Sequence, residues 1–143
     1  MAALSADRQT MILATDAMRS GRGDVAANTK IYFGSVIARN AAGYVVPASD
    51  TVGLKVIGIA QQTVDNTGGA DGALTCTYVT CVTAELDNNG SSVVQANKHS
   101  LVYAMDDHSV APTGSTAHQI LVGTVTKFDA NVVRVFIDER ANA

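Results

Sequence analysis

The feature that most constrains the fold is a polar stretch at residues 64–72, VDNTGGADG, between two apolar segments. The flanking residues 53–60 and 73–82 are rich in β-branched and aromatic side chains, which fit a pleated, half-buried surface. Gly, Asp and Asn enter positive φ at low cost or hydrogen-bond their own backbone. The pattern therefore predicts a strand, a loop and a second strand.

Composition favours one folded domain. The chain has 143 residues, of which 47% are hydrophobic and 16% charged, and disordered segments instead combine low hydrophobicity with high net charge. The charged share is below the usual value of about 25%, which suits a surface that contacts other subunits.

Charge and hydropathy patterning disfavour several kinds of partner. The net charge is −3, and residues 56–133 contain two basic residues, Lys98 and Lys127. Without a basic patch, we expect no nucleic-acid or membrane partner. No apolar run is long enough for a spanning helix, and we expect no secretory signal.

The chain divides into three parts by texture. Residues 1–29 alternate in charge and predict an N-terminal arm that is extended or partly helical, with a possible short helix from Ala6 to Met18 capped by Ser5. Within it, Arg22-Gly23-Asp24 matches a cell-adhesion tripeptide, a match short enough to arise by chance. Residues 138–143 form a polar tail.

Residues 30–137 alternate between strand and turn signals. Short strands at intervals of about ten residues indicate an all-β fold, a compact β-barrel or β-sandwich-like domain. The longest expected strand runs from Leu74 to Glu85, and Pro47 should end its strand or lie at an edge. The predicted strand regions are 31–37, 44–47, 53–60, 74–85, 101–105, 120–125 and 132–137.

No residue pattern marks a catalytic, cofactor or metal site. Cys76 and Cys81, five apart on one expected strand, should face opposite sides and therefore not pair with each other. The histidines His99, His108 and His118 are expected in solvated loops, without metal-ligand spacing.

Two groups of polar residues contain side chains suited to a site but lack the pattern of one. Asp106, Asp107 and His108 resemble an acid–base cluster, but adjacent turn residues rarely converge on one point, and no nucleophile is marked nearby. Asp65, Asn66 and Asp71 lack the alternating register of a calcium loop. We therefore expect no enzyme activity, no cofactor and no small-molecule substrate.

Several segments, in matching order, resemble one family. They are 6–8 (ADR), 30–34 (KIYFG), 38–48 (ARNAAGYVVPA), 64–72, 103–111 (YAMDDHSVA) and 122–125 (VGTV). Together they are similar to the capsid decoration (cement) proteins of Mu-like tailed bacteriophages and prophages. The sequence departs from the family pattern at residues 9–29 and 76–85.

The resemblance implies a non-enzymatic virion protein with a β-barrel-like body. Such a protein is made in the host bacterial cytoplasm and assembles as a homotrimer on the outer capsid surface. It occupies three-fold and local three-fold positions and bridges major capsid protein subunits. We expect residues 2–29 to contact the capsid and residues 30–137 to form the trimer. The alternatives are another virion part, such as a head fibre base or tail protein, and a small-ligand-binding β-barrel.

Overall fold

The computed structural model describes residues 2–13 and 18–142, which form strands joined by turns and short 3-10 helices. The expectation of an all-β fold is confirmed. The strands are β1 (Ile12–Leu13), β2 (Arg19–Asp24), β3 (Lys30–Ile31), β4 (Val36–Arg39), β5 (Val45–Pro47), β6 (Lys55–Ala60), β7 (Val64–Asp65), β8 (Thr75–Thr80), β9 (Val82–Asn88), β10 (Leu101–Ala104), β11 (Ser109–Pro112), β12 (Leu121–Phe128) and β13 (Val132–Ile137). The 3-10 helices are η1 (Asn89–Ser91), η2 (Gln95–Asn97) and η3 (Glu139–Asn142).

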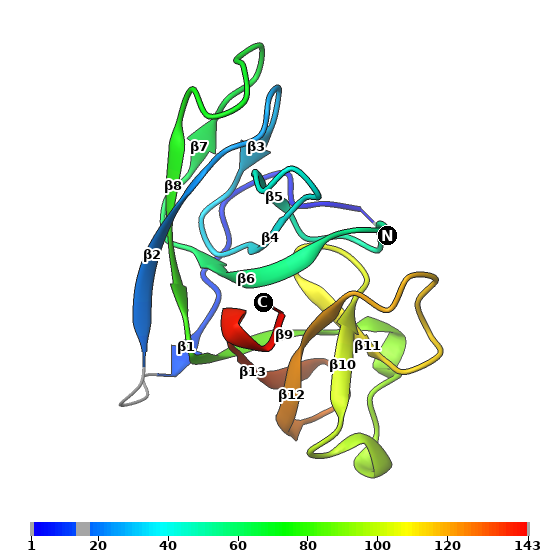
Figure 1. Cartoon of the computed structure of the whole chain (residues 1–143). Helices are drawn as coiled ribbons and strands as arrows, with labels where there is room; N and C mark the ends of the chain where they lie inside the picture. Colours follow the sequence, from blue (N-terminus) through cyan, green and yellow to red (C-terminus); the bar gives the residue numbers. More distant parts are fainter. Residues whose placement is uncertain (1, 14–17, 143) are drawn as a thin grey trace.

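Five strands close into a β-barrel. Strands β9, β11, β10, β12 and β13 pair in that order, and β13 pairs back onto β9 (Figure 1). Neighbours are antiparallel except β9 and β11, which are parallel. Side chains of β9 and β13 alternate between buried and half-buried positions, as the two-residue period of a strand requires. This alternation directs Leu86 and Val135 into the interior.

A second sheet packs against the barrel. Its strand order is β2-β8-β6-β4-β5, and the short pair β3-β7 adjoins it. Val36, Val56 and Ile59 share a buried cluster with barrel residues. Ile37 and Ile57, on the same two strands, belong to another buried cluster. Side chains on both faces of these two central strands are thus buried.

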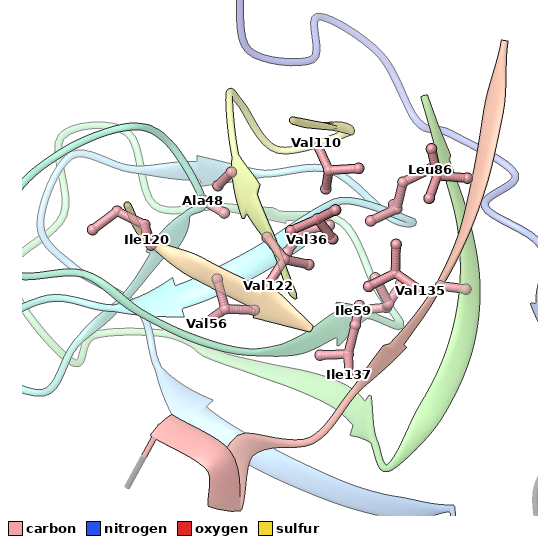
Figure 2. Close-up of a cluster of buried hydrophobic side chains, with 14 of the residues drawn as sticks. Val36, Ala48, Val56, Ile59, Leu86, Val110, Ile120, Val122, Val135 and Ile137 are labelled. Atoms are coloured by element: carbon pink, nitrogen blue, oxygen red, sulfur yellow. The ribbon is translucent and has the colours of Figure 1, made fainter. Parts of the chain in front are cut away.

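The barrel interior and one face of the second sheet form a common core. Figure 2 shows Leu86, Val122 and Val135 of the barrel near Val36 and Ile59 of the sheet. Each of these five side chains is at most 2% exposed. Apolar side chains of the barrel strands and of the second sheet therefore pack together in this core.

The expectation of one long strand from Leu74 to Glu85 is wrong. The chain breaks at Cys81, whose φ is +57°, so that β8 belongs to the second sheet and β9 to the barrel. A left-handed residue turns the strand direction abruptly, and here that turn carries the chain between the two sheets. Cys76 and Cys81 are buried and form no disulfide, as expected, but they do not share a strand.

The helix considered for residues 6–18 is also wrong over the described part. Residues 6–11 have no regular secondary structure, β1 follows at residues 12–13, and residues 14–17 lie outside the described ranges. The apolar positions there are too irregular to form a helical stripe, whereas β9 offers an open edge for pairing. Further along, β2 pairs with β8 over six residues, and Val25 is fully buried.

Other expectations agree with the structure. β5 ends at Pro47 and is an edge strand, where a residue without an N–H is tolerated. Within the 64–72 stretch, residues 64–65 form β7, and the residues after them form the predicted loop that leads to β8 beside the second sheet (Figure 1). η3, in the polar tail, packs back onto β6 through a hydrogen bond from Asn142 Nδ2 to the Val56 carbonyl (3.0 Å).

Candidate functional site

The turn between β10 and β11 concentrates buried charge. Asp106 and Asp107 are 4% and 1% exposed. Asp106 Oδ1 accepts hydrogen bonds from the His108 N–H (3.0 Å), the Ser109 N–H (2.9 Å) and Ser109 Oγ (2.7 Å). An aspartate that bonds the backbone two residues ahead favours this type of turn, which is why the sequence Asp-Asp-His-Ser turns here.

The N-terminal segment, residues 2–13, lies over this turn. Leu4 N–H donates to Asp107 Oδ1 (3.0 Å), and His108 Nε2 is 3.3 Å from the Ala2 carbonyl oxygen. Burial is the largest influence on Asp107 and raises the pKa of its carboxyl group above the ordinary value, despite the hydrogen bond from Leu4. The turn and the segment therefore form one polar contact.

A charged triad continues this contact on β9. Arg8 donates to both carboxylate oxygens of Asp87, from Nη1 (3.2 Å) and Nη2 (3.0 Å). His108 Nδ1 is 2.9 Å from Asp87 Oδ2 and is the donor, because a carboxylate only accepts. Burial acts most strongly on Asp87 and would raise the pKa of its carboxyl group, but the hydrogen bonds and charges of Arg8 and His108 outweigh burial and lower it.

The same segment also reaches the second sheet. Arg8 N–H donates to the Phe33 carbonyl (2.9 Å), and Thr10 Oγ1 donates to the Gly34 carbonyl. Gly34 has a φ of +85°, and a Cβ there would lie 1.8 Å from the Arg8 carbonyl oxygen, so the segment passes closely only because residue 34 is glycine. Beyond it, Glu85 N–H donates to the Met11 carbonyl (2.9 Å). Residues 2–13 thus bridge the two sheets.

The expectation that Asp106, Asp107 and His108 do not converge is wrong. Each offers one ligand atom, and these three atoms lie within 4.8 Å of one another. The Asp106 side chain folds back over its own turn, which brings the three neighbours to one side. The pairing of Arg8 with Asp87 could not be predicted from sequence patterns, because these residues are 79 positions apart.

Polar side chains of the loop at residues 64–72 hydrogen-bond to nearby backbone groups. Asp65 Oδ1 accepts from Thr67 N–H (3.1 Å), and Asp71 Oδ1 accepts from Ala27 N–H (2.7 Å). Buried Asn66 donates from Nδ2 to the carbonyls of Ala26 (2.9 Å) and Ala70 (3.0 Å). These bonds fasten the loop to the chain that follows β2.

The three histidines differ from one another. His99 is exposed, as expected. His118 is exposed but is paired with Asp50 through Nδ1 (3.2 Å to Oδ1). The His108 side chain is 22% exposed and belongs to the cluster above, so the expectation of a solvated loop histidine is wrong for it.

A small hollow lies on the barrel surface. It has a volume of about 130 Å³, below the range of about 300–1,000 Å³ that is typical of ligand pockets. Its lining residues are Glu85, Lys127, Phe128, Asp129, Val132 and Arg134. Its size makes it a poor substrate site.

Comparison of the chain with protein-family models and with curated proteins finds no match. Among the described residues, no helix is both long and apolar enough to cross a membrane.

Proposed function

We propose that this protein is a capsid decoration (cement) protein of a tailed bacteriophage. As a homotrimer, it binds the outer surface of the head at three-fold and local three-fold positions, bridges major capsid subunits and stabilises the shell. The segments that carry the resemblance support this proposal. Three of these segments, 6–8, 30–34 and 103–111, lie close together in the structure although they are far apart in sequence. Arg8 N–H donates to the Phe33 carbonyl, and the side chains of Arg8 and His108 both bond to Asp87.

The structure also supports the role in physical terms. The all-β body is compact, and residues 2–10 of the N-terminal segment attach to it through hydrogen bonds at separate points. Three copies of such a segment on one trimer would act together, because linked contacts raise one another's effective concentration. Modest contacts can then sum to tight binding on the shell.

The small-ligand barrel has less support. Its function would require a lumen, whereas the barrel interior is filled by apolar side chains (Figure 2). The other virion roles are separated from decoration by where the protein binds on the particle.

The test uses the full-length chain and a variant lacking residues 2–10. The deletion stops before β1, because β1 and β2 are paired strands and Val25 is part of the core. Light scattering coupled to gel filtration should give a trimer for both proteins. Isolated phage heads should bind the full-length trimer and not the truncated one.

Two outcomes would reject parts of this proposal. A full-length chain that remains a monomer at all concentrations would contradict the proposed trimer. Undiminished head binding by the truncated trimer would show that the N-terminal segment is not the capsid contact. Electron microscopy of decorated heads should show density at the three-fold positions, and density confined to the tail would favour another virion role.

A further inference from the structure

We infer that Asp106, Asp107 and His108 form a binding site for a divalent transition-metal ion, such as Zn²⁺ or Mn²⁺, beneath the N-terminal segment. The argument for this site does not depend on the proposed capsid role. One imidazole nitrogen and two carboxylates are a ligand set that such ions accept. The three ligand atoms already lie within 4.8 Å of one another.

The first argument is an unsatisfied oxygen. Asp106 is 4% exposed, and its buried Oδ2 has no hydrogen-bond partner among residues 2–13 and 18–142. Oδ1 of the same carboxylate is occupied by three donors, so Oδ2 is the oxygen left to bind a cation. A buried acceptor without a partner costs about 1–3 kcal/mol, and a metal ion would remove that cost.

The second argument is the orientation of His108. Its Nδ1 donates to Asp87, as the ring nitrogen opposite a metal commonly does. Nε2 then faces two acceptors, Asp106 Oδ1 at 3.4 Å and the Ala2 carbonyl oxygen at 3.3 Å. A metal ion would replace the proton on Nε2, because ligands lose their protons on binding a metal, and the ion would then lie between Nε2 and these oxygens.

Charge and distance agree with this assignment. Two adjacent buried carboxylates place negative charge that a divalent ion would neutralise. Ligands with bonds of about 2.1 Å lie at most about 4.2 Å apart. The widest separation of 4.8 Å therefore needs only a small side-chain movement. The Ala2 carbonyl would serve as a fourth ligand and tie the chain start to the barrel.

The test is calorimetric titration of the full-length, chelator-treated protein with ZnCl₂ and, separately, MnCl₂. We expect one bound ion per chain. CaCl₂ should bind more weakly, because Ca²⁺ prefers oxygen ligands to imidazole. Bound metal should also slow tryptic cleavage after Arg8, because the segment that contains this bond would be held more firmly.

Two substitutions locate the site. Asp106→Asn keeps the oxygen that caps the turn and replaces Oδ2 with an amide nitrogen. His108→Asn keeps an N–H donor near the Nδ1 position and removes Nε2. Since even outer-shell partners are worth about 10- to 100-fold in affinity, each change should weaken binding at least about tenfold. His118→Asn, in the exposed pair with Asp50, should bind like the parent.

Circular dichroism of the metal-free variants checks that each is folded, and electron paramagnetic resonance of Mn²⁺ gives a second readout on the parent protein. Absence of Zn²⁺ and Mn²⁺ binding by the parent would overturn the inference. Binding that is unchanged in both the Asp106 and His108 variants would overturn it as well, because the ion would then lie elsewhere.

Discussion

The N-terminal segment (residues 2–13) and β2 (Arg19–Asp24) belong to the same predicted arm, yet they are attached to the body by different means. The segment is held by separate hydrogen bonds to Asp87, Asp107 and Gly34 and by a pairing of only two residues, β1 on β9. β2 is held by a six-residue ladder to β8 and is followed by fully buried Val25. Ordered residues near a terminus can therefore be either a peripheral segment or a part of the core. Charge and hydropathy patterns in the sequence do not distinguish these two cases.

The largest expected effect comes from deleting residues 2–26 in place of residues 2–10. The longer deletion removes β2 and Val25 and uncovers Tyr78 and Cys76 on β8, so we expect a protein that no longer unfolds cooperatively. The shorter deletion should retain a cooperative thermal transition, measured by circular dichroism. Similar melting curves for the two proteins would contradict the difference in attachment.

Gly34→Ala should detach the N-terminal segment and leave β2 in place. The new Cβ would lie 1.8 Å from the Arg8 carbonyl oxygen, and φ of +85° is unfavourable for alanine. We expect a loss of about 1–3 kcal/mol in the free energy of unfolding, together with faster tryptic cleavage after Arg8.

Gly43→Ala is the matched control for this substitution. Gly43 has a φ of +90°, and an added Cβ there would meet nothing within 4 Å. Gly43→Ala should lower the free energy of unfolding through the unfavourable φ alone, without faster tryptic cleavage after Arg8. Equal cleavage rates in the two variants would mean that the close approach at Gly34 does not hold the segment.

Tyr78, on β8 opposite Gly21 of β2, should make the stability of the protein depend on pH in alkaline solution. Burial, and then the hydrogen bond to Glu139 Oε2 (2.7 Å), raise the pKa of Tyr78 to about 12 from 10.0. Between these values the unfolded chain loses this proton while the folded chain keeps it, so the free energy of unfolding falls as the pH rises. The contribution is fully present below pH 10 and amounts to about 2–3 kcal/mol.

Tyr78→Phe should reduce that decline, measured as denaturant unfolding between pH 10 and 12. The parent and the variant share the remaining tyrosines and lysines, so the difference between their slopes isolates Tyr78. Identical slopes would show that Tyr78 ionises equally in both states.

The smallest expected effect is that of Arg8→Ala. Its bond to Asp87 is bidentate, but the two side chains are 25% and 42% exposed, and such pairs contribute up to about 1 kcal/mol. Arg22→Ala, at an exposed position of β2, is the control and should leave stability unchanged. A loss for Arg22 as large as that for Arg8 would show that the Arg8–Asp87 bond adds nothing specific to the attachment of the segment.

Local chemistry explains which parts of the fold could be predicted. The 64–72 loop, the end of β5 at Pro47 and most barrel strands follow from side-chain periodicity and turn residues. The break at Cys81 could not be predicted, because cysteine rarely adopts a positive φ and only the packing of two sheets requires it there. The convergence of Asp106, Asp107 and His108 depends on how one side chain folds over its own turn. The Arg8–Asp87 contact depends on tertiary structure alone.

The position of β9 has a consequence for the order of folding. Ile12 near the chain start pairs with Ala84, and Ile137 near the chain end pairs with Val82. On the ribosome, the barrel therefore stays open until the last strand has emerged, because its closing partner is β13. Contacts of such long sequence separation form slowly, and until they do, the edge of β9 that later receives β13 is exposed to other nascent chains.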